Sequence, residues 1–270
     1  MRFQRTFAFS TAMVAGAFVG ACAIPQPTFE CNALAPFWAS YEIQSGAGTG
    51  TCSELPGDLI NMQRYLLPGS MEPTIGIMPR RLGRLRLTTN LDGTYAYVDP
   101  TDPQYAKEAA IGTFSSLLPD KVGVCTMSSI APTDQNYPAG VITVEGEDGG
   151  VAEEPLDALA IKYEWSNMKI LSTAQYPGTL FVADLHLKEN DCDATFKVYG
   201  IHPLVPCDSD IDCDPSPDTD GGPRTIGSGM SADYAPRCKL YPDGTPESMK
   251  GIRDYAGICF PTKGFDELAK

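Results

Sequence analysis

The sequence predicts a mainly β protein: an antiparallel sandwich or partly closed barrel that carries one or two helices and ends in an irregular, disulfide-stapled C-terminal tail. Three observations predict this class. Apolar and polar residues alternate along several segments of the chain, as in strands with one solvated face. The 270 residues include 26 glycines and 23 prolines, which favour turns over long helices. The cysteine pattern is typical of exported, disulfide-bonded proteins.

Composition and cysteine spacing divide the chain into four segments. We expect a lipoprotein signal peptide at residues 1–21, a tether at 22–30, a β-rich domain at 31–206 and a Cys-rich irregular tail at 207–270. The tail is rich in Asp, Gly and Pro and poor in strand-forming residues. It therefore buries little apolar surface of its own and depends on its cysteines for shape.

The leader has the layout of a secretory signal. It begins with the basic residues Arg2 and Arg5 and continues with an uncharged, almost wholly apolar run at residues 7–19. That run is shorter than the roughly 20 apolar residues that an uncleaved membrane span needs. The leader is therefore expected to be removed after export.

The leader ends in Val19-Gly20-Ala21-Cys22, which resembles the lipobox of bacterial lipoproteins. In those proteins the cysteine receives a diacylglyceryl group and becomes the mature N-terminus, so the resemblance implies that Cys22 is lipidated and anchors the chain to a membrane. Ala23 replaces the aspartate that retains some lipoproteins in the inner membrane, which implies an outer-membrane lipoprotein, either periplasmic or surface-exposed. Ordinary secretion is the alternative, because Ala21-Cys22-Ala23 also fits the small-x-small rule for signal cleavage.

Either cleavage removes Cys22 from the disulfide count and leaves an even number of cysteines. These eight are Cys31, Cys52, Cys125, Cys192, Cys207, Cys213, Cys238 and Cys259. Zinc is disfavoured, because CxxC pairs are absent and no histidine has ligand spacing with a cysteine. Eight cysteines allow 105 pairings. Our hypothesis pairs Cys31 with Cys52 and Cys125 with Cys192, and places two bridges within the last four.

The first part of the domain is predicted to mix strands and helices. Residues 37–43 predict the first strand, and residues 59–67 a short helix capped by Asp58. Residues 84–88 and 94–98 alternate around an Asp-Gly turn, which predicts a hairpin. A second helix is expected after Asp102-Pro103, ending at Pro119, with an apolar stripe of Ala106, Ala110, Phe114 and Leu117.

The second part of the domain predicts strands throughout. We expect a short strand at residues 141–144, an acidic loop at 146–154 and a strand at 159–165, in which every second residue is apolar. Residues 179–188 and 194–201 form the clearest predicted hairpin. Leu185 and its apolar neighbours at every second position face one way, and the polar residues between them face the other, as in an antiparallel sheet with one solvated face.

Three stretches extend the resemblance beyond the lipobox. They are the Ser45–Cys52 segment SGAGTGTC followed by Gly57-Asp58, the strand Ile161–Asn167 with the sequence IKYEWSN, and the Gly227–Met230 segment GSGM before paired cysteines. Together they are similar to a family of predicted lipoproteins from gliding, predatory soil bacteria. The resemblance spans most of the chain after its leader and implies no activity.

The sharpest catalytic candidate is Ser70. Ser70, Met71, Pro73 and Thr74 resemble the serine box of type I signal peptidases, where a neutral lysine activates the serine. The later motifs of that family are missing, and Lys107 and Lys121 lie in unrelated contexts. A turn after the predicted helix, stopped by Pro68-Gly69, is the simpler interpretation, so we assign no catalytic residue. An extracytoplasmic hydrolase with Ser70 as nucleophile is kept as an alternative function.

Calcium is the one cofactor that the sequence suggests. Asp208, Asp210 and Asp212 alternate in the tail, and calcium prefers several carboxylate and carbonyl oxygens. The stretch departs from an EF-hand, which would place Gly and Glu where Cys213 and Thr219 stand. A solvated acidic turn between disulfides is the simpler interpretation. A calcium-dependent adhesion module is a further alternative, and otherwise we expect no cofactor.

For two other polar groups the structural interpretation is preferred to the functional one. Asp184 and His186 share a strand face and have the chemistry of a general-base pair, but no nucleophile accompanies them. Arg80, Arg81, Arg84 and Arg86 are the one cluster of cations in the sequence. They suit either an anionic partner or the protein's own acids.

The charge of the chain narrows the function. A net charge of −14 repels nucleic-acid backbones, so nucleic-acid binding is disfavoured. We therefore expect a lipid-anchored, extracytoplasmic lipoprotein that binds or scaffolds and does not catalyse. Its partner, a protein or a polysaccharide, is left open.

Overall fold

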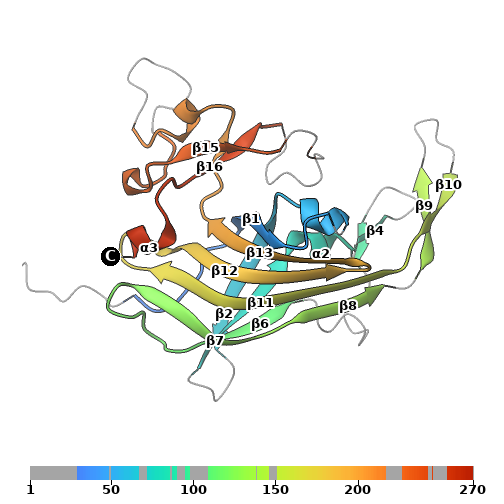
Figure 1. The fold of residues 1–270 in the computed structure, drawn as a ribbon, viewed down its shortest axis with the longest axis horizontal. Helices are drawn as coiled ribbons and strands as arrows, with labels where there is room; N and C mark the ends of the chain where they lie inside the picture. The colour runs from blue at the N-terminus through green and yellow to red at the C-terminus, as the bar shows by residue number, and fades with distance from the viewer. Residues whose placement is uncertain are drawn as a thin grey trace, which may run out of the picture.

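The computed structural model describes residues 29–48, 50–66, 72–85, 87–89, 95–97, 109–137, 139–145, 151–216, 227–242, 245 and 254–269. Cys22, Ser70 and Lys107 lie outside these residues, and so do the expected start of the second helix and the loop at 146–150. The fold is mainly β, as predicted. Figure 1 shows one large curved sheet with smaller elements at both ends.

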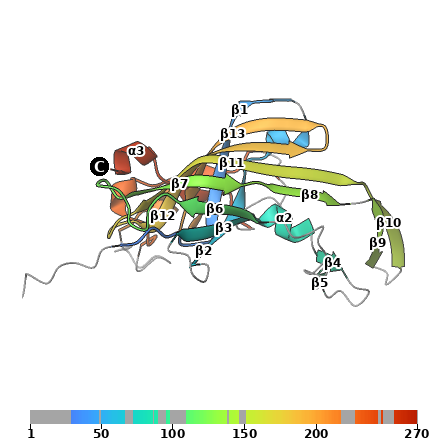
Figure 2. The ribbon, with the colours of Figure 1, turned by 90° about the horizontal axis from the view of Figure 1, so that it is seen from below.

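A nine-stranded antiparallel sheet forms the body, in the order β12-β13-β1-β2-β3-β6-β7-β11-β8. Because β12 pairs with β13 along one edge and with β11 along the other, the sheet closes into a ring (Figures 1 and 2). Of the two predicted architectures, the structure therefore adopts the barrel-like one. The strands are β1 (Phe37–Ser45), β2 (Gly57–Leu66), β3 (Pro73–Pro79), β6 (Ala110–Phe114), β7 (Val124–Ala131), β8 (Thr133–Tyr137), β11 (Leu159–Ser172), β12 (Pro177–Glu189) and β13 (Cys192–Ile201).

The long hairpin of β12 and β13 confirms the clearest prediction from the sequence. The two strands pair from Leu180↔Ile201 to Glu189↔Cys192, and Asn190 takes a left-handed conformation in the turn between them. Side chains of β12 alternate between the ring interior and the outer face, where Asp184 and His186 lie. The predicted strands at 37–43, 141–144 and 159–165 are also present, as parts of β1, β9 (Gly140–Glu145) and β11.

The ring interior is filled by apolar side chains. Every second residue of each strand points inward, so the core draws on all of the strands around the ring. The rings of Phe37 and Phe181 pack edge to face, with their centroids 5.0 Å apart. Gly200 on β13 leaves room for the Phe181 ring, because a Cβ at this position would lie 1.8 Å from Phe181 Cε1.

The two helices expected in the first part of the domain are wrong where the structure describes them. The segment expected as a helix at 59–67 is strand β2, in which Ile60 and Met62 are buried and which pairs with β1 and β3 on its two edges. Ala110 and Phe114 lie on β6. A spacing of four residues is close to one helical turn and equals two strand repeats, so the apolar stripe fitted both structures.

The segment after β3 differs from the expected strand. Residues Arg80–Leu85 form the short helix α2, which buries Leu82 in the core. The predicted hairpin survives in a shortened form, as β4 (Leu87–Thr89) paired with β5 (Tyr95–Tyr97). The acidic segment expected as a loop is partly a strand, because β10 (Val151–Leu156) pairs with β9. Figure 1 shows this β9–β10 hairpin projecting at one end of the ring.

The tail is more regular than the sequence predicted. It contains a three-stranded sheet of β14 (Pro206–Cys207), β16 (Gly257–Phe260) and β15 (Arg237–Leu240). The short helices are η3 (Asp210–Cys213), η4 (Ala232–Tyr234) and α3 (Phe265–Leu268), and a further one, η1 (Thr51–Glu54), lies in the ring domain. Figure 1 shows the tail at the end of the ring away from the β9–β10 hairpin.

The tail packs against the outer face of the ring. Leu180, Val182 and Ile201 point outward and form a second core with Tyr234 and Phe265 of the tail. The rings of Tyr176 and Tyr234 stack with their centroids 5.0 Å apart, and the Tyr234 hydroxyl lies 2.9 Å from Thr179 Oγ1. These contacts could not be predicted from the sequence, because the apolar residues of the tail are scattered and its partner surface lies on distant strands.

Four disulfides join the eight cysteines. The last four cysteines pair with one another, as Cys207–Cys238 and Cys213–Cys259. The other two pairings that we expected are wrong, because the bridges are Cys31–Cys125 and Cys52–Cys192. Cys31 and Cys52 stand before and after β1, whose nine residues span about 30 Å at 3.3 Å per residue. They therefore lie at opposite ends of the ring.

Replacing Gly200 by alanine tests the packing inside the ring. The added methyl group meets the Phe181 ring, which is buried and held against Phe37, so we expect the free energy of unfolding to fall by about 1–3 kcal/mol. Gly264→Ala is the matched control, because a Cβ at position 264 has nothing within 4 Å. Urea unfolding measures both variants. Equal stabilities would show that the Phe181 side chain moves aside without cost.

Candidate functional site

A groove runs between the ring and the tail and is the best-formed candidate site among the described residues. Its volume is about 420 Å³, within the usual range of ligand pockets. The ring contributes Leu180 and Tyr199, from β12 and β13. The tail contributes Phe260, Phe265 and Leu268, from β16 and α3. The walls are therefore mostly apolar and come from segments far apart in the sequence.

Positive charge borders this apolar groove. Arg237, Lys239 and Lys263 line it together with a single acid, Glu42. The Lys239 ammonium lies 5.3 Å from the centroid of the Phe260 ring and donates a hydrogen bond of 2.6 Å to Ser40 Oγ. Lys263 is exposed and forms no ion pair with the described residues. The chain as a whole has a net charge of −14, so these three cations give the groove a charge opposite to that of the protein.

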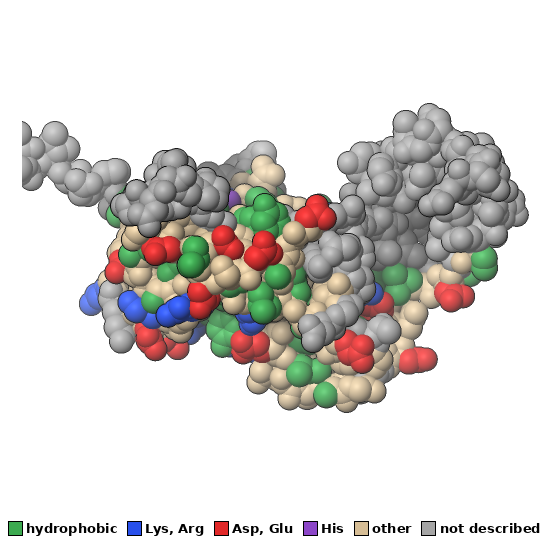
Figure 3. Space-filling model, turned by 90° about the horizontal axis from the view of Figure 1, so that it is seen from above, with side chains coloured by type: hydrophobic (Ala, Val, Ile, Leu, Met, Phe, Trp, Pro, Cys, Tyr) green, Lys and Arg blue, Asp and Glu red, His purple; other side chains and the backbone are tan. Residues whose placement is uncertain are grey.

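Acidic and basic side chains are distributed differently over the surface around the tail. Figure 3 shows acidic side chains spread over the face seen from above, while basic side chains gather mainly at one end. Two of the groove cations interact with acids: Arg237 Nη1 lies 2.9 Å from Asp210 Oδ2, and Lys239 Nζ lies 3.7 Å from Glu42 Oε1. A groove with apolar walls and a basic border suits a ligand with an apolar body and a negative group.

One weak signal for this site is present in the sequence. Arg237 and Lys239 flank a cysteine, and such alternation places both side chains on one face of a strand. The surrounding tail is rich in turn-forming residues, so these cations do not stand out beside the more compact arginine cluster at 80–86. The apolar walls have no sequence signal, because they belong to two separate segments.

A second polar site lies where α2 closes one end of the ring. Asp58 at the start of β2 accepts hydrogen bonds from the backbone N–H groups of Leu59 (2.7 Å) and Arg81 (3.1 Å). The Arg81 guanidinium donates two hydrogen bonds to the carboxylate of Glu189, at the end of β12. Asp58 is thus a helix cap, as its residue type suggested, but for a helix that begins 22 residues further along the chain.

Burial dominates the electrostatics beneath α2. It raises the pKa of Asp58 to about 6, against the opposing effect of the N–H donors and of Arg81 and Arg80. Burial, with a smaller contribution from the charge of Asp58, also raises the pKa of Tyr41 and Tyr163 well above the usual range. Asp58 and Glu189 both accept hydrogen bonds from Arg81 and thereby hold α2 to the ring, which supports a structural role for this site. Of the four arginines in the sequence cluster, Arg80 and Arg81 act on Asp58 here, and Arg86 lies outside the described residues.

Asp184 and His186 do not form a pair with each other. His186 lies between two acids, with Nε2 2.6 Å from Asp193 Oδ1 and Nδ1 3.0 Å from Glu164 Oε2. Asp184 instead accepts hydrogen bonds from Lys197 (2.9 Å) and Asn167 (2.6 Å). Both belong to a ladder of charged side chains across the outer face of β11, β12 and β13. This arrangement supports the interpretation as a solvated face.

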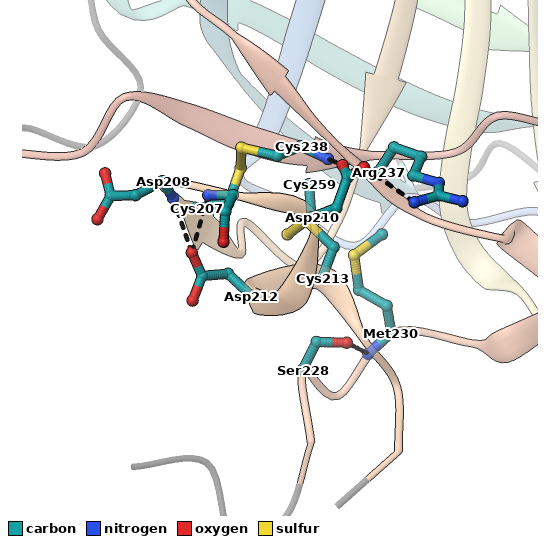
Figure 4. The surroundings of a disulfide bond; sticks show 11 residues. Cys207, Asp208, Asp210, Asp212, Cys213, Ser228, Met230, Arg237, Cys238 and Cys259 are labelled. Atoms are coloured by element: carbon teal, nitrogen blue, oxygen red, sulfur yellow. Dashed lines mark hydrogen bonds and ion pairs between the residues drawn. A yellow bond between two sulfur atoms is a disulfide. The ribbon is translucent and has the colours of Figure 1, made fainter. Parts of the chain in front are cut away.

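The three tail aspartates bind the chain's own donors (Figure 4). Asp212 Oδ2 accepts from the N–H groups of Asp208 and Ser209, at 2.8 and 3.0 Å. Asp210 accepts from the Cys238 N–H and the Arg237 side chain, and Asp208 from the Ala256 N–H. A calcium ion would have to displace these donors. Within the described residues, the one group with metal-ligand spacing is Cys207, Cys213 and Cys259, whose sulfurs are all in disulfides.

The remaining sequence candidates lie outside the residues that the structure describes. Lipidation of Cys22 and nucleophilic attack by Ser70 therefore stay predictions. Within the described part of the chain, no helix has the length and apolar character needed to span a membrane.

The fold and its groove define a class: a closed antiparallel ring with a disulfide-bonded module on its outer face. The chain belongs to the MlpA family, whose sequence model matches residues 35–203. It is 24% identical over 263 residues to the Myxococcus xanthus protein named "Putative lipoprotein MlpA", in a match that covers 93% of this chain and 94% of that protein. No solved structure matches the chain. The family assignment confirms the resemblance to lipoproteins of predatory soil bacteria.

Asp58 makes the stability of the protein depend on pH in a specific way. Its pKa is about 6 in the folded chain and near 3.8 when exposed, so between these values the folded state keeps a proton that the unfolded state has lost. The stability from this group is full below pH 3.8 and is lost as the pH rises through 6. The loss amounts to about 3 kcal/mol, since each pKa unit corresponds to about 1.4 kcal/mol.

We therefore expect Asp58→Asn to remove this loss, as measured by urea unfolding from about pH 4 to pH 7. The difference from the native protein is the relevant quantity, because Glu164, Asp184, Asp193 and Asp210 have lowered pKa values and act in the opposite direction. Asp266→Asn on α3 makes the same charge change at an exposed position and serves as the control. A native pH profile in Asp58→Asn would contradict the assignment.

Proposed function

We propose that this protein is a lipid-anchored lipoprotein of the cell envelope that binds an amphipathic anion, an acyl chain with a carboxylate, in the groove between the ring and the tail. The observation that carries the proposal is the combination of apolar walls with three cations in an acidic protein. No catalytic group is needed for this role. Ser70, the nucleophile of the alternative hydrolase, lies outside the residues that the structure describes, and among those residues no observation favours a calcium-dependent adhesion module.

The shape of the groove supports an acyl ligand. Leu180, Phe265 and Leu268 offer aliphatic and aromatic surface to a chain, and burial of each CH₂ group contributes about 0.8 kcal/mol. The cations stand at this apolar surface, where the ligand's carboxylate would replace water around them. Lys263 is best suited to receive it, because it forms no ion pair with the described residues, whereas Arg237 and Lys239 already face acids.

The lipid anchor is supported by two observations. The leader ends in a lipobox-like segment at Cys22, and the Myxococcus xanthus relative bears the name "Putative lipoprotein MlpA". Residue 30 is next to Cys31 and lies at the same end of the ring. It is eight residues beyond Cys22, so an extended chain between these two positions reaches at most about 29 Å. We place the protein in the outer membrane on the basis of Ala23, with its leaflet left open.

Intact mass of the protein extracted from membranes tests the anchor. We expect a chain that begins at Cys22 and carries acyl groups, and we expect Cys22→Ala to abolish both the added mass and the membrane fractionation. The eight remaining cysteines should be oxidised in the same sample, since each is in a bridge. A soluble chain that begins at Ile24 without lipid would establish ordinary secretion instead.

Titration with a fluorescent fatty acid tests the groove. We expect saturable binding that weakens about tenfold in Lys263→Glu, because the reversed charge repels the carboxylate. Binding of the matching fatty alcohol should be weaker in the native protein and nearly unchanged by the substitution.

Lys188→Glu provides the matched control for that titration. Lys188 lies on β12 eight residues beyond Leu180, about 26 Å along the strand, and faces the charged ladder. The same charge reversal at this distance should leave fatty-acid affinity unchanged. The groove proposal fails if the acid does not bind, or if Lys263→Glu and Lys188→Glu bind it equally.

A further inference from the structure

Exposed apolar side chains gather at the end of the ring where the chain enters from its tether. They belong to Phe29, Leu34, Leu118 and Val122, with exposed fractions of 38%, 37%, 44% and 44%. Within the described part of the ring domain, the other large apolar side chains with comparable exposure are those of Ile43 and Ile111. Most of this exposed apolar surface therefore lies on two short segments. We call Phe29, Leu34, Leu118 and Val122 the tether-end surface.

A hydrogen bond and a disulfide hold the two segments together. The Cys31 N–H donates to the Leu117 carbonyl at 2.8 Å, and Cys31 is bonded to Cys125. Phe29 stands two residues before Cys31, and Leu118 directly follows Leu117, so both flank this hydrogen bond. Figure 1 shows the loop between β6 and β7 at this end of the ring. The first described residues and the β6–β7 loop thus present their apolar side chains at the same end.

The β6–β7 loop is fixed by its own hydrogen bonds. Asp120 Oδ1 accepts from the N–H groups of Val122 and Val124, at 3.0 and 2.8 Å. The Gly123 N–H donates to the Asp120 carbonyl at 3.0 Å, and Gly123 takes the left-handed conformation that this turn requires. The exposure of Val122 is therefore a property of a well-bonded turn.

The charges at this end are compatible with a lipid surface. The Glu30 carboxylate lies 2.6 Å from Arg64 Nη2, and the Asp120 carboxylate is occupied by the N–H groups of its loop. Lys121, between Leu118 and Val122, is exposed and forms no ion pair with the described residues. Apolar side chains with a lysine beside them suit the boundary between acyl chains and phosphate headgroups.

The tether selects the bilayer as the occupant of this surface. Phe29 is seven residues beyond Cys22, so it lies within about 25 Å of a lipid anchor there even when the chain between them is extended. The opposite end of the ring is farther away by the length of β1, about 30 Å. Because the anchor makes contact with the bilayer intramolecular, a few apolar side chains are sufficient to maintain it.

We propose that the tether-end surface rests in the interfacial region of the bilayer to which Cys22 anchors the chain. Phe29, Leu118 and Val122 enter the boundary between headgroups and acyl chains, and the Lys121 ammonium lies among the phosphates. The ring then stands on the membrane at this end, with the Cys52–Cys192 bridge directed away from it. This inference rests on the lipid anchor proposed above and is independent of fatty-acid binding in the groove.

Tryptophan insertion tests the contact. Lipidated Leu118→Trp and Val122→Trp proteins are reconstituted separately into phosphatidylcholine vesicles, whose brominated form quenches indoles at the depth of the upper acyl chain. Tryptophan favours the membrane interface, so we expect each added indole to shift its emission to shorter wavelength and to lose about half of it in brominated vesicles. Trp38 and Trp165 are buried, and the native protein measures their background. If one variant does not fold, the other carries the test.

Ile43→Trp is the matched control. Ile43 is 39% exposed and lies six residues beyond Phe37 on β1, about 20 Å farther from the tether end. Its tryptophan should keep a solvent-like emission in both kinds of vesicle. Adding Leu118→Glu to Val122→Trp should restore most of the quenched emission, because a carboxylate is costly to transfer into an apolar interface.

Intact mass of the same samples separates failure of this inference from failure of the anchor. If Cys22 carries lipid and the tryptophans at 118 and 122 are quenched no more than the one at 43, the inference is wrong and the anchor stands. A blue shift without quenching by bromine would show that protein covers the surface, which also overturns the inference. A mature chain that begins at Ile24 without lipid would remove the anchor and this contact together.

Discussion

The backbone pairing of β12 on both of its edges is the interaction on which the rest of the structure depends. Its residues from Leu180 to Glu189 bond to β13 on one side, and β11 occupies the other side along almost the same length. A sheet closed in this way has no free edge at this point and encloses an interior. Because side chains alternate, β12 directs Phe181 into that interior and Leu180 and Val182 to the outside.

This one strand therefore supports two cores and both candidate sites. The outward residues provide the platform for the tail, and the groove lies along that contact. The inward residues belong to the apolar core of the ring. The end of the strand supplies Glu189, which holds Arg81 and thereby α2 over the ring. A register shift of one residue on β12 would exchange the two faces and disrupt both sites.

The disulfides secure the parts of the fold that the sheet alone does not hold. Cys31–Cys125 and Cys52–Cys192 join residues 94 and 140 positions apart and lie at opposite ends of the ring. The tail bridges span 31 and 46 positions and hold a small sheet with little core of its own. Bridges over long stretches stabilise mainly by restricting the unfolded chain, at about 2–4 kcal/mol each. An oxidising compartment is therefore part of the folding requirement.

The sequence by itself determined the class of the protein, since strand alternation, turn residues and an even set of eight cysteines are local or countable properties. The β12–β13 hairpin was predictable for the same reason, because its turn and its alternation lie within one continuous stretch. The predictions of a helix at 59–67 and of another after Asp102-Pro103 were wrong where the structure describes them. In the second, the apolar spacing of four residues suits helix and strand alike.

Only the tertiary structure decided which cysteines pair, how Asp58 meets a helix that begins 22 residues later, and where the groove lies. Each of these depends on distances between segments remote in the sequence, such as Leu180 and Phe265, or Tyr41 and Tyr163. Such distances are set by the closure of the ring and the docking of the tail, to which many residues contribute weakly and no short motif contributes decisively. The sequence supplies the side chains of the sites, and the closed sheet with its docked tail brings those side chains together.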